Sequence, residues 1–225
     1  MEDGKVMSSL NVLYEDNHVI VVEKPVNVLS QGDSTGDISL LDMVKTYVKE
    51  KYNKPGNVYI GLVHRLDRPV GGIMVFARTS KAAARLSKQI AECNFSKKYY
   101  AIVSGCLEND GDTFIDYLKK LDSGNTVVSR DGKKAILSYR MIEYSKELDA
   151  SLVDITLETG RHHQIRVQFA SRGHALLGDQ RYGKQDKTQI ALFSYELKFV
   201  HPVSKEEMLF NLKPSNIGYW KNFKL

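Results

Sequence analysis

Two short apolar runs on either side of a charged segment constrain the fold most strongly. The segment lies in GLVHRLDRPVGGIMVFART, between apolar residues 58–63 and 72–77. Both runs are rich in Val and Ile and bounded by Gly or Pro, which is typical of buried strands. Asp67 then lies on a tight connection held from both sides, where proteins often place chemistry. The alternative is that Asp67 only pairs with a neighbouring arginine to fix the turn.

Across the rest of the chain, predicted strands outnumber predicted helices. Apolar runs and alternating patterns predict strands at 18–22, 95–105, 112–117, 135–144, 152–157 and 193–199, with a returning strand around 208–212. Helical spacing predicts helices over 39–52 and 80–93, and a third that begins near Thr159-Gly160 and ends at Gly173. Polar connections are expected at 122–134 and 173–183. Without regular βαβ alternation, this pattern predicts an α+β fold, with flanking helices on a mixed, mostly antiparallel sheet, in a single domain over residues 1–225.

Composition sets limits on partners and compartment. The chain has 225 residues and a net charge of +5, which fits a polyanion partner without demanding one. Cys93 and Cys106 form no CxxC pair, and we expect both to be buried small hydrophobes in a reducing compartment. The polar N-terminus, MEDGKVMSSL, is no signal peptide, and no apolar run is long enough to span a bilayer. We therefore expect no membrane association and a cytoplasmic location.

Two kinds of chemistry are open to the polar residues. His64, Asp67, His162 and His163 are metal-ligand types and define a metal-dependent hydrolase as one alternative. Their spacing matches no zinc pattern such as His-Glu-x-x-His, and cysteine ligands are missing, so we predict no metal. The sequence also lacks a P-loop and a Gly-x-Gly-x-x-Gly segment, so it predicts no nucleotide cofactor.

The second kind is a single carboxylate, Asp67, that acts as nucleophile or base. A carboxylate in that role must be charged, positioned and kept from competing water. A nearby guanidinium favours the charged form, and either Arg65 or Arg166 could supply it. Arg166 follows His162 by four residues and His163 by three, so we expect the three to share one helical face.

Five segments, in order, resemble motifs of the RluA-type RNA pseudouridine synthases. They are VLYEDNHVIVVEKP (12–25), His64-Arg65-Leu66-Asp67 with its Gly-rich turn, Lys97-x-Tyr99-x-Ala101 with Gly105, LETGRHHQIRVQFASRGHALLGDQRYG (157–183), and 193–202. The chain departs from the family at Arg68-Pro69-Val70-Gly71-Gly72 and at Gly173-His174-Ala175, which bears on substrate shape. Only eleven residues precede the first motif, so we expect the short form without an N-terminal S4 RNA-binding domain.

The resemblance implies site-specific isomerisation of uridine to pseudouridine in structured RNA, ribosomal or transfer RNA or both, without a cofactor. It implies that Asp67 is the essential carboxylate, which either attacks the nucleoside or removes a sugar proton. Arg166 would pair with Asp67, and Tyr99 would stack on the target uracil. Arg65 would fill the space that the flipped nucleotide leaves, and Ile165 would line the apolar wall.

Other readings stay open at this point. Structural pairing or core packing is the alternative for Arg65 and Ile165. Contacts with RNA phosphates are expected for four basic residues, Lys24, Lys81, Arg85 and Lys88. A non-catalytic RNA-binding protein of the same fold is the alternative function.

Overall fold

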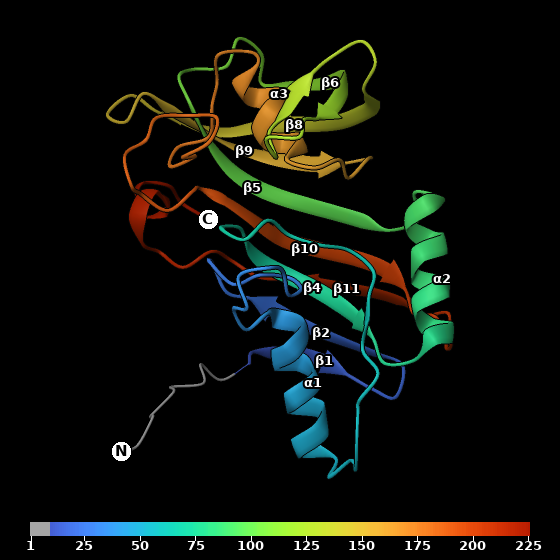
Figure 1. Ribbon diagram of the computed structural model, residues 1–225. Coiled ribbons are helices and arrows are strands. Elements are labelled where there is room, and N and C mark those ends of the chain that lie inside the picture. Colours follow the sequence, from blue (N-terminus) through green and yellow to red (C-terminus); the bar gives the residue numbers. More distant parts are fainter. Residues whose placement is uncertain (1–9) are drawn as a thin grey trace.

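One twisted sheet runs through the molecule and joins its two ends (Figure 1). The computed structural model describes residues 10–225. The strands are β1 (Val12–Glu15), β2 (Val19–Lys24), β3 (Gly61–Leu62), β4 (Gly71–Ala77), β5 (Ser96–Ser104), β6 (Gly111–Lys120), β7 (Thr126–Val128), β8 (Lys133–Ser145), β9 (Ala150–Leu157), β10 (Leu192–Val200) and β11 (Glu207–Asn211). The helices are α1 (Leu40–Lys51), α2 (Ser80–Ala91), α3 (Gln164–Ala170) and the 3-10 helix η1 (Gly218–Asn222).

The strand order is β1-β2-β4-β10-β5-β9-β8-β6-β7, with β11 beside β10 and β3 beside β4. Among the pairs in residues 10–225, β4 with β10 is parallel and the others are antiparallel. This arrangement confirms the predicted α+β fold with a mixed, mostly antiparallel sheet.

The parallel pair requires a glycine directly after the Asp67 connection. Gly72 has a φ of +129°, and a Cβ there would lie 2.3 Å from the carbonyl oxygen of Ser194 in β10. Both the left-handed φ and the short contact exclude any residue with a side chain at position 72. The Gly-Gly step therefore lets β4 approach β10 and fixes where the connection before it ends.

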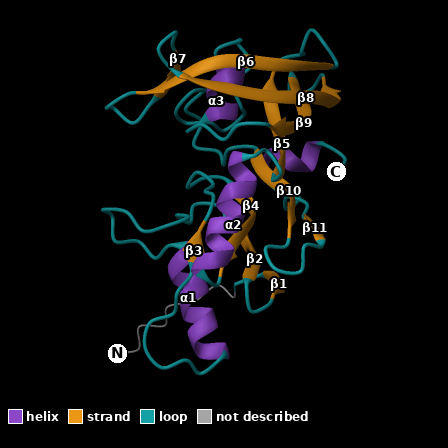
Figure 2. Ribbon diagram, turned by 90° about the vertical axis from the view of Figure 1, so that its right-hand side faces the viewer, coloured by secondary structure: helices purple, strands orange, loops and turns teal. Residues whose placement is uncertain are grey.

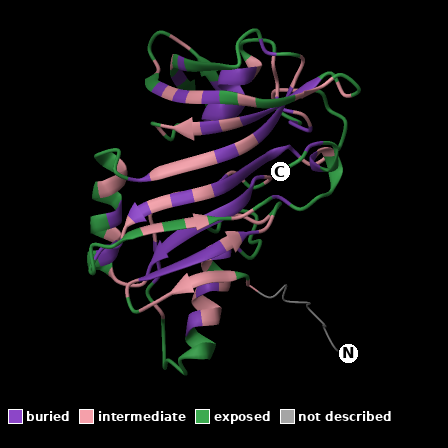
Figure 3. Ribbon diagram, turned by 180° about the vertical axis from the view of Figure 1, so that it is seen from behind, coloured by how far each residue is buried: buried purple, intermediate pink, exposed green. Residues whose placement is uncertain are grey.

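Helices cover both faces of β2, which explains its unbroken apolar sequence. Ile20 and Val22 pack in the core cluster that contains the buried face of α1. Val19 and Val21 pack in the cluster that contains Ala82 and Leu86 of α2. α1 starts directly after its capping residue, because Ser39 and Asp42 form a reciprocal capping box. Figure 3 shows β2 and β4 buried along most of their length.

The third helix covers the other end of the sheet (Figure 2). The ring of Phe169 in α3 lies 5.1 Å from that of Phe114 in β6 and 5.5 Å from that of Tyr139 in β8. This packing fixes α3 with residues 165 and 166 facing the connection before β4.

Three local predictions were wrong. Most of 58–63 is not a strand, since β3 contains only Gly61 and Leu62. β3 pairs with the end of β4 at residues 76 and 77, and β10 pairs with its start at residues 71 and 72, so the two strands share one edge of β4. The connection 122–134 contains a strand, β7. The third helix begins at Gln164, not near Thr159, because the Gln164 side chain accepts from Thr159 Oγ1 and from Arg161 N, so the chain turns before the helix.

Both cysteines are free, as expected, but both are exposed, so the prediction of buried positions was wrong. Cys93 follows α2 with a φ of 58°, at a turn where the chain leaves the helix. The N-terminal nonapeptide, for which the sequence predicts no signal peptide, lies outside the described residues. None of the helices in residues 10–225 is long and apolar enough to cross a membrane.

Candidate active site

The connection from β3 to β4 is held by hydrogen bonds to its backbone. Four consecutive carbonyl groups, those of residues 66–69, each accept one. The donors are Ser30 Oγ to Leu66 (2.7 Å), Val70 N to Asp67 (3.0 Å), Lys24 Nζ to Arg68 (3.0 Å) and the Gln189 amide to Pro69. Ser30 Oγ also accepts from Leu66 N, at 3.1 Å. The backbone that carries Asp67 is therefore fixed from three separate segments of the chain.

Lys24 supports this connection from inside and does not face RNA. The residue is 0% exposed, and its Nζ also donates to the carbonyl of Pro25 at 3.0 Å. Burial lowers the pKa of Lys24 to about 7. The prediction that Lys24 contacts an RNA phosphate was wrong, because its ammonium group is used by backbone acceptors that lie under the site.

The carboxylate of Asp67 is held by one of its oxygens. Oδ2 lies 3.1 Å from Arg166 Nη1 and 3.6 Å from His163 Nε2. Oδ1 makes no hydrogen bond within residues 10–225, and the side chain is 28% exposed. The arrangement leaves one carboxylate oxygen open to a substrate while a guanidinium, 7% exposed, fixes the other.

Arg166 is in turn aimed by Asp179, which sequence reasoning missed. Its Nε and Nη2 donate to the two oxygens of Asp179 at 2.8 and 2.7 Å. Oδ1 of Asp179 also accepts the backbone N–H groups of Arg181 and Tyr182. Burial acts to raise the pKa of Asp179, but the hydrogen bonds and charge of Arg166 outweigh it and the pKa is lowered. Asp179 lies in the segment GDQRYG, between two glycines. A single acidic residue in this polar segment was the only sequence feature that could have marked it as a partner of Arg166.

A cavity of about 1770 Å³ opens in front of Asp67. Its wall includes the Tyr99 ring from β5 and Ile165 from α3, which are only 5% and 4% exposed. Burial raises the pKa of the Tyr99 phenol, and the charge of Asp67 acts in the same direction, so this group stays protonated at neutral pH. Basic residues also line the cavity: Arg65, Arg68, Lys97, Lys120, Arg161, Arg181 and Lys187.

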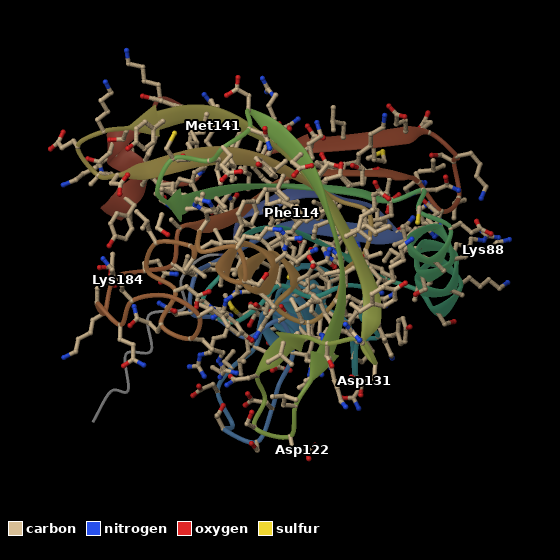
Figure 4. All side chains as sticks on the ribbon, turned by 90° about the horizontal axis from the view of Figure 1, so that it is seen from above. Lys88, Phe114, Asp122, Asp131, Met141 and Lys184 are labelled. Carbon is tan, nitrogen blue, oxygen red and sulfur yellow. The ribbon has the colours of Figure 1, made fainter. Side chains whose placement is uncertain are left out.

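The structure therefore brings together five of the predicted site residues around one cavity, namely Arg65, Asp67, Tyr99, Ile165 and Arg166. Arg65 is exposed there and forms no ion pair with the described residues. The basic face of α2 lies elsewhere and does not line the cavity. Arg85 donates to the Pro202 carbonyl, and Lys88, which extends outward in Figure 4, lies 3.6 Å from Glu92.

The histidines do not assemble as metal ligands. Nε2 of His64 accepts the backbone N–H of Val75 at 3.1 Å, and burial lowers the pKa of His64 to about 3. Nδ1 of His162 lies 2.8 Å from Thr126 Oγ1, and the residue precedes α3, so it does not share a helical face with Arg166 as expected. In the part of the chain that the structure describes, no three His, Cys, Asp or Glu side chains could hold a metal ion.

Comparison with known proteins assigns the family. Residues 18–171, which include Asp67, Tyr99 and Arg166, match the family model described as RNA pseudouridylate synthase. The chain belongs to the RNA pseudouridylate synthase family. The resemblance seen in the sequence motifs is therefore confirmed. The protein is an RNA pseudouridine synthase, an isomerase of uridine in RNA.

Relatives along most of the chain agree with this assignment. The synthase is 35% identical over 220 residues to ribosomal large subunit pseudouridine synthase D of Zymomonas mobilis, covering 90% of this chain and 68% of the relative. It is 31% identical over 220 residues to an RNA pseudouridine synthase of Aquifex aeolicus, covering 91% and 69%. The fold matches the human RNA pseudouridylate synthase domain containing 4 with a TM-score of 0.76, at 21% identity and over 91% of this chain and 89% of that one.

Proposed function

We propose that this synthase converts uridine to pseudouridine at defined positions of large-subunit ribosomal RNA, with Asp67 as the catalytic carboxylate. The observation that carries the assignment of Asp67 is its geometry: Arg166 holds Oδ2, and Oδ1 is left for the substrate beside Tyr99. The relative from Zymomonas mobilis and one from Buchnera aphidicola, 30% identical, are named for the large ribosomal subunit. The names of these relatives support a ribosomal substrate, and a cytoplasmic location fits it.

The reaction breaks the bond between C1′ and N1 of uridine and forms a bond between C1′ and C5. The proton on C5 leaves and N1 gains one, so atoms balance and no co-substrate is consumed. The open oxygen of Asp67 either attacks the nucleoside or removes a sugar proton. In both routes Arg166 stabilises the charged carboxylate and fixes its direction.

The target nucleotide must leave its stack to reach Asp67, which costs a few kcal/mol. Arg65 is suited to offset this cost, because its guanidinium is exposed at the cavity without an ion pair in residues 10–225 and can stack in the vacated space. Tyr99 would then stack on the uracil, with Ile165 as the apolar wall. Both are buried, so the bound base would be shielded from water.

The cations around the cavity favour a polyanion at its mouth. Besides Arg65 and Arg166, six Arg and Lys side chains line it, and they would contact the phosphates on either side of the flipped uridine. Lys81, Arg85 and Lys88 would contact only RNA that reaches past the cavity to α2.

The test is to map pseudouridine in ribosomal and transfer RNA from cells with and without the gene, and then in each purified RNA treated with the enzyme. We expect loss of the modification at one or a few large-subunit positions, restored by the purified protein. Loss confined to transfer RNA would contradict the ribosomal substrate. An unchanged map, together with no product in vitro, would contradict the proposal as a whole.

A further inference from the structure

His163 lies in a backbone conformation that its side-chain contacts explain. It is the residue before α3 and has a φ of 53°, in the left-handed region. Non-glycine residues adopt this region uncommonly and at a cost in free energy, and such positions cluster at functional sites. Its side chain makes no capping hydrogen bond to the helix. The conformation instead directs the ring between Asp67 and Tyr182, where it is 9% exposed.

Each edge of the ring faces one partner. Nε2 lies 3.6 Å from Asp67 Oδ2, and Nδ1 lies 2.7 Å from the Tyr182 hydroxyl. One face of the ring stacks on His162, with 3.7 Å between ring centroids. His162 is itself tied to Thr126 Oγ1 in β7 at 2.8 Å. The imidazole is therefore held in place at its edges and on one face.

The Tyr182 hydroxyl determines which ring nitrogen carries the proton. This oxygen accepts the backbone N–H of Thr126 at 2.9 Å, and within the described residues its own proton has one acceptor, His163 Nδ1. If Nδ1 carried a proton, the phenol would be left without an acceptor, and a nitrogen lone pair would face the carboxylate of Asp67. Both penalties vanish when Nδ1 accepts and Nε2 carries the proton.

We propose that His163 is a positioning residue for Asp67: a neutral imidazole, locked by Tyr182 with its proton on Nε2, that holds Oδ2 together with Arg166. Burial lowers the pKa of His163 to about 4, which agrees with a neutral ring at pH 7. The distance of 3.6 Å is long for a hydrogen bond, and such bonds in free enzymes tighten when substrate binds. Two donors on one oxygen direct the other oxygen, Oδ1, towards the ribose. The proposal rests on the role proposed above for Asp67.

The test uses Tyr182→Phe, which removes the hydroxyl and keeps the ring that lies 5.2 Å from the Arg166 guanidinium. We expect kcat to fall about tenfold with KM for RNA unchanged, because binding groups are untouched and only orientation is lost. Tyr139→Phe is the matched control. In the wild type the Tyr139 hydroxyl donates to the carbonyl of Asn109 at 3.4 Å and does not line the cavity, so kcat should not change in this variant. His163→Gln, which keeps an N–H donor, should retain more activity than His163→Leu.

A second readout does not depend on activity. The ¹⁵N shifts of the histidine rings report the tautomer, and the signals of His163 among the six histidines are identified by their loss in His163→Gln. We expect Nε2–H in the wild type and a mixture of tautomers in Tyr182→Phe. Nδ1–H in the wild type, or full kcat in Tyr182→Phe, would overturn the proposal. A wild type that has the Nε2–H tautomer but makes no pseudouridine would contradict the proposed function and support the geometry inferred for His163.

Discussion

Asp179→Asn should weaken both the fold and the site, although the substitution changes only a few atoms. The side chain is 0% exposed and receives two hydrogen bonds from Arg166. The asparagine oxygen can take the place of Oδ1, where it still accepts from Arg166 Nη2 and two backbone N–H groups. Its NH2 group then takes the place of Oδ2 and points at Arg166 Nε, so two hydrogen-bond donors face each other. Loss of one partner of a buried pair costs about 3–5 kcal/mol, and we expect the lower end because Asp67 still faces the guanidinium.

A loss of about 3 kcal/mol corresponds to a fall in Tm of roughly 6–12 °C for a chain of this length. The control is Glu207→Gln, because Glu207 pairs with Lys198 at 2.9 Å and the two side chains are 63% and 44% exposed. That variant should lose about 1 kcal/mol or less. Urea denaturation and thermal melts measure both, and kcat should fall at least about tenfold in Asp179→Asn alone. Equal, small losses in the two variants would refute the reasoning.

Three further predictions address the connection before β4 and the cavity. Gly72→Ala should cost about 3 kcal/mol or more, because its Cβ would overlap the β10 backbone, whereas Gly32→Ala, with open space around it, should change the free energy of unfolding by under about 0.5 kcal/mol. The pKa of Lys24 is about 7 in the fold and 10.5 unperturbed, so between these two pH values the unfolded chain binds more protons than the folded one and the free energy of unfolding rises with pH. Lys24→Met should remove up to about 1.4 kcal/mol per pH unit of that rise, measured by urea denaturation at several pH values. An unchanged slope would contradict the burial of this amine. Lys97→Met should weaken RNA binding and lower the salt dependence of the binding constant by about one counterion, because Lys97 lines the cavity. Lys98→Met, which removes a partner of Glu196 outside the cavity lining, should do neither. Equal changes in the two variants, with binding measured across a series of KCl concentrations, would exclude a contact between Lys97 and RNA in the cavity.

Much of the fold and the centre of the site could be predicted because their signals are local. The apolar runs of β2 and β4 indicate burial on both faces. The resemblance of the motifs around Asp67 and Arg166 to those of the family implied a pair that lies 99 residues apart in the chain. The length of β3 could not be predicted in this way. Hydrophobic pattern records burial rather than pairing, and the edge of β4 was already shared with β10.

The remaining errors concern groups whose partners are distant in sequence. Lys24 ends a strand, and nothing near it shows that its amine turns inward to the carbonyl of Arg68, 44 residues away. Asp179 and Tyr182 lie in a loop without periodicity, so their contacts with Arg166 and His163 follow from tertiary packing alone. The left-handed backbone of His163 is likewise set by its neighbours in space, and it moved the start of α3 past the position that helical spacing predicted.

The central claim is that one oxygen of Asp67 performs the chemistry while Arg166 holds the other. The most direct measurement is single-turnover formation of pseudouridine by Asp67→Asn on the mapped ribosomal RNA, with RNA affinity measured on the same sample. We predict no detectable product and an affinity within about threefold of the wild type, because the substitution removes the reacting oxygen's charge and leaves the basic cavity wall intact. Product formation at a rate near that of the wild type would contradict the account.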